Sequence, residues 1–165
     1  MINTVIDIFE DFRTLIIFLH IMSASILIGS MFVMIFIVRP ASASVKDIDK
    51  KCANCLKILR RYIIFLIPVM LIVVSASFFM NVGMGFEYGD PSAMIIIHIK
   101  ETIWIFIAFN FVYAFKKYLN AKKAFEEQDL LVAQENIILI VKYLIPLNLL
   151  VSIIAAYLGI VISSY

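Results

Sequence analysis

Apolar residues dominate four long stretches of this chain, and shorter polar stretches separate them. The apolar stretches cover approximately residues 14–38, 62–82, 92–115 and 137–160. Each approaches or exceeds the roughly 20 residues that an α-helix needs to cross the hydrocarbon core of a bilayer. The pattern therefore predicts an all-α integral membrane protein, an up-and-down four-helix bundle that forms a single transmembrane domain over residues 1–165.

Composition supports a membrane environment and excludes a soluble domain of appreciable size. Of the 165 residues, 64% are hydrophobic, and the mean hydropathy is +1.04, whereas soluble domains contain roughly 45–50% apolar residues. The first apolar stretch is expected to remain as a span rather than to be removed as a signal peptide. The residues before it (Asp7, Glu10 and Asp11) are acidic where a signal peptide is basic.

Lysine and arginine are concentrated in two of the three connections between the spans. The first connection holds Arg39, Lys46, Lys50, Lys51, Lys57, Arg60 and Arg61, and the third holds Lys116, Lys117, Lys122 and Lys123. By the positive-inside rule both connections are cytoplasmic, so both termini lie outside. We therefore expect a multi-pass protein of a bacterial-type inner membrane. The net charge of +2 reflects topology and contact with anionic lipid headgroups, and gives no indication of a nucleic-acid partner.

Two histidines lie inside predicted spans at the same depth. His20 is about six residues inside the outer end of the first span, and His98 about six residues inside the outer end of the third. At about 1.5 Å per residue, each lies roughly 9 Å below the outer surface. Because ionisable residues within a membrane are costly, they usually have a functional role.

The chain also shows a weak internal repeat. A shift of 78 positions, without a gap, places His20 on His98, Ile21 on Ile99, Arg39 on Lys117 and Pro68 on Pro146. The matches favour a tandem repeat of two-helix units related by a pseudo-twofold axis along the membrane normal. In that arrangement the two histidines face each other.

Two imidazoles from separate helices suit a metal that takes ligands on opposite sides, and haem iron is the leading case. Small residues one turn from His20, namely Ser23 and Ala24, are expected to make room for the flat ring, and Arg13 is a candidate partner for the propionates. A lone intramembrane histidine would more simply hydrogen-bond a neighbouring helix. The matched pair of His20 and His98 favours b-type haem.

Lys100 and Glu101 lie about two turns inside the third span, where a charge costs several kcal/mol unless it is paired or hydrated. Glu101 follows His98 by three residues and is expected to share its face, where it can orient the imidazole or relay protons. Lys100 lies about 200° around the helix and is expected to point elsewhere. Both are candidate catalytic residues. The alternatives are mutual neutralisation and extension of the lysine toward the interface.

Several short motifs resemble two related membrane families. The stretch HIMSASILIGSMFVMIFIVRP is similar to the first span of the copper-resistance protein D family, through His20, Gly29, Ser30, Arg39 and Pro40. The stretches RRYIIFLIPVM and IIHIKETIWI are similar to the second and third spans of the membrane protoporphyrinogen-oxidase family, through Arg60, Arg61, Pro68, Met70, His98 and Lys100.

The resemblance implies a four-span scaffold with a haem-type site. Together with the histidine pair, it leads us to expect a protein that binds haem b and transfers electrons or performs a haem-linked oxidation, with a membrane quinone or a redox partner protein. The oxidase family's motif after its first-span histidine, which has an arginine closer in sequence, is not reproduced here. The resemblance therefore leaves open whether this chain is a membrane oxidoreductase of that type.

Sulfur-containing residues provide an alternative metal site. Four methionines are expected near the outer side: Met22, Met80, Met84 and Met94. Thioether and imidazole ligands together suit Cu(I), so copper binding or copper transport is the alternative function. Cys52 and Cys55 lie on the cytoplasmic side, where a structural disulfide is not expected, and their role is left open.

A third alternative is a structural subunit of a larger membrane complex, in which the intramembrane charges pair with another chain. The chain has no glycine-rich phosphate loop, nucleophile elbow or metalloprotease helix motif. For its assembly, a homo-oligomer and membership of a larger complex both stay open.

The charge asymmetry generates a prediction of orientation. Tags at either terminus are expected to be reachable from outside intact cells, whereas Cys52 and Cys55 are expected to react with an impermeant maleimide only from the cytoplasmic side. An N-terminus that is accessible only from the cytoplasm would contradict the assignment.

Overall fold

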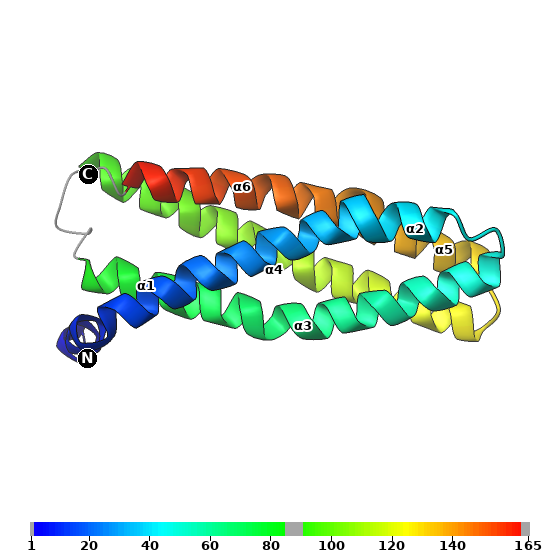
Figure 1. Cartoon of the computed structure of the whole chain (residues 1–165), viewed down its shortest axis with the longest axis horizontal. Coiled ribbons are helices and arrows are strands. Elements are labelled where there is room, and N and C mark those ends of the chain that lie inside the picture. The colour runs from blue at the N-terminus through cyan, green and yellow to red at the C-terminus, as the bar shows by residue number, and fades with distance from the viewer. Residues whose placement is uncertain (1, 85–90, 163–165) are drawn as a thin grey trace.

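The computed structural model describes residues 2–84 and 91–162 and is helical almost throughout (Figure 1). Its elements, in chain order, are α1 (Ile2–Val33), the π-helical segment η1 (Met34–Val38), α2 (Arg39–Ala43), α3 (Ile48–Gly83), α4 (Pro91–Glu126), α5 (Leu130–Ile138), the π-helical segment η3 (Leu139–Leu144) and α6 (Ile145–Ile162). The part of the chain that the structure describes contains no strand. The predicted all-α class is confirmed.

These elements form four rods, each long and apolar enough to cross a membrane. The rods are Thr4–Ala43, Ile48–Gly83, Met94–Glu126 and Leu130–Ile162. They run up and down, with both termini at one end of the bundle and α2 and α5 at the other (Figure 1). We call the first the terminal end and the second the basic end. The prediction of a multi-pass, four-helix membrane bundle is therefore confirmed.

The rods are longer than the apolar stretches that predicted them. The 36 residues of α3 reach about 54 Å at about 1.5 Å per residue, well beyond a hydrocarbon core of roughly 30 Å. The surplus lies at the basic end, where α3 begins at Ile48 and α4 continues to Glu126. The polar connections are thus largely helical extensions of the spans.

Two acidic residues start the helices that leave the basic end. Asp47 accepts a hydrogen bond from the Lys50 amide at 3.2 Å, and Asp129 accepts one from the Val132 amide at 3.1 Å. Each carboxylate satisfies one of the amide groups that have no partner inside a helix start. Gln128, with φ of 62°, adopts the left-handed conformation that closes the turn between α4 and α5.

The two π-helical segments each precede a proline. Pro40 follows η1 by two residues, and Pro146 follows η3 by two. Proline lacks an amide hydrogen and its ring collides with the carbonyl four residues earlier, so a wider turn relieves the contact. Pro68 lies within α3 and is accommodated there without such a turn.

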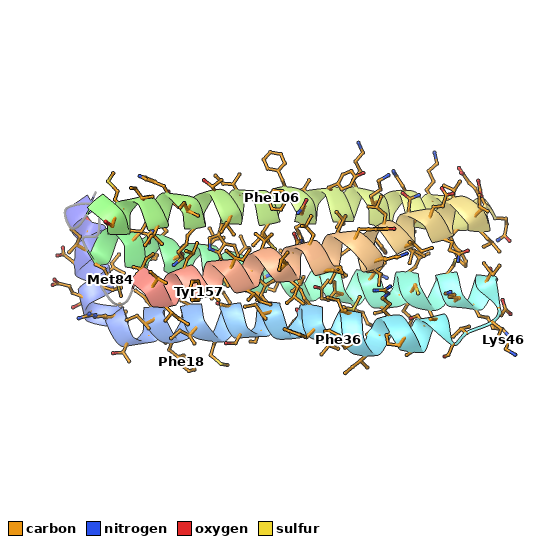
Figure 2. All side chains as sticks on the ribbon, turned by 90° about the horizontal axis from the view of Figure 1, so that it is seen from above. Phe18, Phe36, Lys46, Met84, Phe106 and Tyr157 are labelled. Atoms are coloured by element: carbon orange, nitrogen blue, oxygen red, sulfur yellow. The ribbon has the colours of Figure 1, made fainter. Side chains whose placement is uncertain are left out.

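The bundle is packed most continuously through its middle and its basic half. Leu27, Leu59, Leu66 and Ile140 are almost completely buried in one cluster. Large apolar side chains instead radiate outward along all four rods (Figure 2), and Phe109 is 70% exposed. An outer surface this apolar is suited to contact with lipid rather than with water.

A polar contact joins α4 and α6 inside the apolar middle of the bundle. The Asn110 side-chain amide of α4 donates to the Asn148 side-chain oxygen of α6 at 3.0 Å. Hydrogen bonds between helices of this kind contribute about 0.6 kcal/mol on average in membrane proteins. This pair fixes the rotation of α4 against α6 close to the cavity described below.

Gly83 allows α1 and α3 to approach closely at the terminal end. A Cβ atom at Gly83 would overlap the ring and Cβ of Phe9, a residue that is buried in the cluster formed with Ile16 and Ala76. Gly29 of α1, by contrast, faces open space. The two glycines thus differ in packing, although both lie on helices.

This difference gives a test of the packing. Gly83→Ala is expected to destabilise the bundle by about 1–3 kcal/mol because the Phe9 ring must move, whereas Gly29→Ala is expected to be neutral or slightly stabilising because alanine favours a helix. Thermal unfolding of the two variants in the same detergent checks the prediction. Equal melting temperatures would show that α1 does not pack on α3 as described.

Candidate functional site

A cavity of about 470 Å³ lies in the half of the bundle nearer the terminal end. Residues of α1, α4 and α6 form most of its wall, and Met80 and Met84 close it on the side of α3. Cofactor sites commonly occupy about 300–1,000 Å³ and lie between helices of bundles. The volume and position therefore suit a ligand of cofactor size.

Small side chains explain why the bundle is hollow here. Ala24 and Ser25 of α1 face Ala155, Ala156 and Gly159 of α6 across the cavity. Elsewhere in the bundle leucine and isoleucine fill the corresponding space. The cavity thus exists because small residues occupy these positions of α1 and α6.

Three buried polar atoms border the cavity without a hydrogen-bond partner among the described residues. They are the His20 Nδ1, the Trp104 Nε1 and the Ser152 Oγ, and all three residues line the cavity. Ser152 is only 4% exposed. A buried polar group without a partner costs about 1–3 kcal/mol, so three at one place indicate that a ligand or ordered water completes their hydrogen bonding.

Lys100 adds a positive charge to the same wall. Its ammonium lies beside α6 and would be 3.5 Å from a Cβ atom at Gly159, and it is close enough to His20 for the two groups to interact electrostatically. Lys100 has no ion pair with any residue that the structure describes. The cavity is therefore apolar, cationic on one side, and suited to a ligand that carries a carboxylate or another oxygen-rich group.

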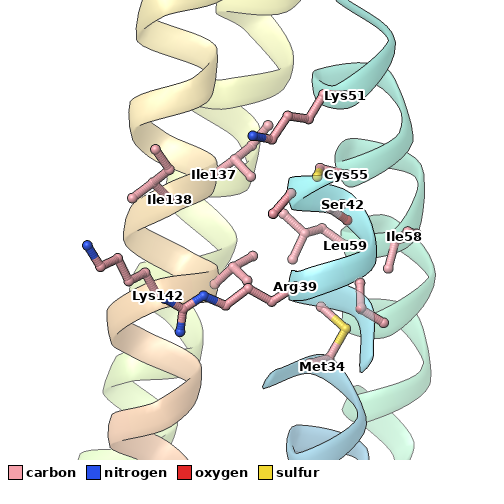
Figure 3. Close-up of a pocket in the computed structure, with 13 residues that line it drawn as sticks. Met34, Arg39, Ser42, Lys51, Cys55, Ile58, Leu59, Ile137, Ile138 and Lys142 are labelled. Atoms are coloured by element: carbon pink, nitrogen blue, oxygen red, sulfur yellow. The ribbon is translucent and has the colours of Figure 1, made fainter. Parts of the chain in front are cut away.

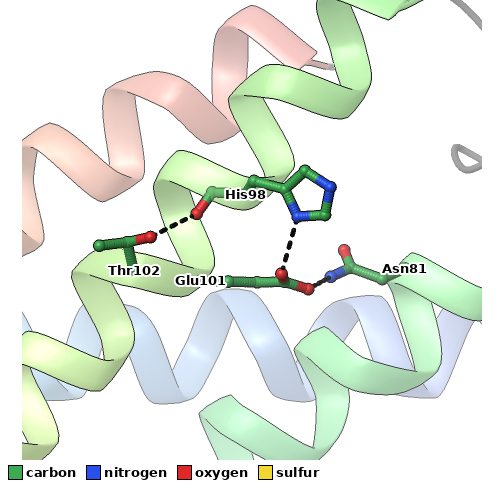
Figure 4. Close-up of polar contacts among 4 residues, drawn as sticks. All are labelled: Asn81, His98, Glu101 and Thr102. Carbon is green, nitrogen blue, oxygen red and sulfur yellow. Dashed lines mark hydrogen bonds and ion pairs between the residues drawn. The ribbon is translucent and has the colours of Figure 1, made fainter.

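His98 lies outside this cavity. Its Nδ1 is 3.2 Å from the Glu101 Oε2, and the Asn81 amide donates to the Glu101 Oε1 at 3.3 Å (Figure 4). The Thr102 hydroxyl donates to the His98 carbonyl at 2.9 Å, and the imidazole side chain is 62% exposed. Glu101 thus contacts His98, as their spacing indicated, but the structure does not bring His20 and His98 into one cavity.

The other residues predicted to surround a haem are divided by the structure. Ala24 lines the cavity with His20. Ser23 is buried, and its hydroxyl donates to the carbonyls of Leu19 at 2.5 Å and of His20 at 3.2 Å, so it does not face the cavity. Arg13 is exposed and does not line the cavity.

The methionines predicted as copper ligands are divided in the same way. Met80 and Met84 line the cavity with His20, whereas Met22 and Met94 are 46% and 42% exposed. Among the described residues no three His, Cys, Asp or Glu side chains are grouped to hold a metal ion. The imidazole and the two thioethers are therefore the metal-binding set that this cavity offers.

Cys52 and Cys55 are free, buried thiols at the basic end. Along α3 they lie about 37 Å or more from Met80, at about 1.5 Å per residue, so they take no part in the cavity. Their burial also means that the labelling test of orientation is better performed with Ser44→Cys, at an exposed position in the connection between α2 and α3.

Two residues of the cavity wall, Trp104 and Ser152, were not among those predicted from the sequence. Trp104 is the one tryptophan of the chain and lies one helical turn after Lys100. Ser152 lies one turn after Asn148, which is also polar and buried. Polar residues spaced by four in an otherwise apolar span share a helix face, and this spacing could have identified both.

Comparison of the chain with protein-family models, with curated proteins and with solved structures found no match.

Proposed function

We propose that this protein binds a b-type haem in the cavity at the terminal end and transfers electrons within the membrane. The observation that carries the proposal is a histidine with an unpaired buried ring nitrogen in an apolar cavity of about 470 Å³. Imidazole is a common axial ligand of haem iron in proteins, and haem when bound supplies one-electron chemistry.

The donor set around the cavity fits this group. His20 would hold the iron through its imidazole, and the thioethers of Met80 and Met84 would be the candidates for a further ligand. Lys100 is suited to hold a carboxylate of the porphyrin edge, the role the sequence had suggested for Arg13. The Trp104 N–H is a further donor toward such an oxygen.

His98 is the other axial ligand suggested by the sequence, but the observed contacts favour a different role. With Glu101 and Asn81 it forms a polar, exposed group between α3 and α4. Such a group is suited to proton exchange at the surface or to contact with a redox partner, because an imidazole can both donate and accept a hydrogen bond. A membrane quinone or a partner protein would provide or accept the electron.

Copper is the second candidate, because one observation favours it specifically. Imidazole and two thioethers line one cavity, and this ligand set suits Cu(I). A structural role in a larger complex is the third, in which the charge of Lys100 pairs with a partner chain. The three candidate functions predict different contents of the purified protein: haem, copper, or neither.

An absorption spectrum of the purified protein tests the proposal. We expect a Soret band and reduced α and β bands, and we expect His20→Ala to lose or strongly alter them because an axial ligand is removed. If thioether sulfur is the second ligand, Met80→Leu or Met84→Leu will convert low-spin iron toward high spin, whereas His98→Ala will leave the spectrum unchanged.

The alternatives predict other results from the same set of variants. A colourless protein that carries copper, and that loses the copper in His20→Ala and Met84→Leu, would show that the cavity binds copper and not haem. A protein with neither haem nor metal would support the structural role. Conversion to high spin in His98→Ala, together with intact spectra in both methionine variants, would instead support His20 and His98 as the two iron ligands.

Lys100 generates a separate prediction. Removal of its positive charge by Lys100→Gln is expected to lower the haem reduction potential by about 50 mV, because a nearby cation disfavours the oxidised, more positive iron. Lys117→Gln is a matched control on the same helix, since the Lys117 ammonium lies over the Tyr113 ring at 5.5 Å and does not line the cavity. Redox titration measures the reduction potential of each variant. An equal shift in the two variants would show that Lys100 does not act at the haem site.

A further inference from the structure

A second cavity lies at the basic end of the bundle, far from the proposed haem site. It has a volume of about 210 Å³ and is partly open. Met34 and Val38 of η1 and Val141 and Lys142 of η3 contribute to its wall. Both π-helical segments of the described chain therefore meet at this cavity, and π-helical turns are frequent at functional sites.

Three cations line this cavity, each from a different element. They are Arg39 of α2, Lys51 of α3 and Lys142 of η3. Figure 3 shows the Arg39 side chain extended toward the helix that carries Lys142. No carboxylate lines the cavity, and none of the three cations has an ion pair with a described residue.

This arrangement favours an anion. Arg39 and Lys142 are exposed and Lys51 is partly buried, so water reaches these cations, and an anion bound at the cavity would be attracted by each of them. For Lys142, the Tyr143 ring partly takes the place of an anion, because the ammonium lies 5.5 Å from the centre of that ring. Arg39 and Lys51 have no such partner in the described structure. A bound anion would supply the partner that these cations lack among the described residues.

The rest of the wall is apolar. Met34, Ile58, Leu59 and Ile138 line the cavity together with the cations. A ligand that satisfies both parts combines an anionic group with a hydrocarbon chain. The volume is smaller than the roughly 300 Å³ at which sites for small soluble ligands begin, so the cavity fits a headgroup and the start of a chain that continues along the outer surface.

We propose that the cavity between η1, α2, α3 and η3 binds an anionic phospholipid, with its headgroup attracted by Arg39, Lys51 and Lys142 and an acyl chain on the apolar wall. Basic pockets between membrane helices on the cytoplasmic side bind such headgroups, and the cytoplasmic leaflet is the anionic one. The positive-inside rule predicts that this end, with its cation-rich connections, lies on that side. The inference is independent of haem, because it uses none of the residues of the other cavity.

The test uses the full chain purified in a neutral detergent. Native mass spectrometry with added phosphatidylglycerol or phosphatidylcholine measures which lipid the protein retains, and a titration gives the affinity. We expect phosphatidylglycerol to be retained preferentially. Arg39→Gln or Lys142→Gln alone is expected to weaken it about fivefold, and both together about 25-fold if the effects are additive.

A matched control carries the same change of charge outside the cavity. Lys57 and Arg60 are exposed on the same part of α3 and do not line the cavity. Lys57→Gln with Arg60→Gln is expected to change the affinity by less than about twofold, since exposed charges outside the site are screened by salt. Lys142→Arg keeps the cation and is expected to retain binding, which separates charge from damage to the fold.

Three outcomes would overturn the proposal. They are equal retention of both lipids, an equal loss of affinity in the control pair, and full competition by soluble glycerol phosphate, which would assign the site to a free phosphate compound. None of them bears on the haem spectrum, so this proposal and the proposed function fail separately.

Discussion

A hydrocarbon environment offers no hydrogen-bond partner, and the rest of this structure follows from that constraint. It requires the backbone to satisfy its own amides and carbonyls, so the chain crosses the apolar layer as helices. Side chains are held to the same condition. Asn110 and Asn148 meet it by pairing with each other, and the His20 ring meets it in part through the backbone of Val73. The His20 Nδ1, the Trp104 Nε1 and the Ser152 Oγ have no partner within the described chain. Where a membrane protein leaves polar groups unsatisfied around a cavity, that cavity is the natural place for a ligand.

The coarse fold could be predicted from the sequence because hydrophobicity over some 20 residues depends on composition and not on packing. The helix ends at Asp47 and Asp129 have ordinary capping chemistry and could be predicted in the same way. The π-helical segments could not. Pro40 and Pro146 are each preceded by a widened turn, whereas Pro68 is not, so the outcome depends on neighbouring helices and not on the proline alone.

The candidate site was only partly predictable, because depth can be read from a sequence but the rotation of a nearly uniform apolar helix cannot. His20 and His98 were placed at equal depth, yet α1 turns its histidine into the bundle and α4 turns Lys100 and Trp104 inward instead. At the offset of 78 residues, Lys100 corresponds to Met22, which is exposed. The inward faces of the two helices are therefore not equivalent, although the offset aligns their histidines.

The widened turn in the first rod also changes how its two halves relate. A π-helical turn holds one residue more than an α-helical turn, so every side chain beyond it is advanced by about 100° in rotational phase. His20 precedes η1 and Arg39 follows it. The two halves of the first rod therefore turn different helix faces toward the cavities at its two ends. A deletion of one residue within 34–38 would bring the two faces back into line along a regular α-helix. The length of this short segment thus couples the geometry of one cavity to that of the other.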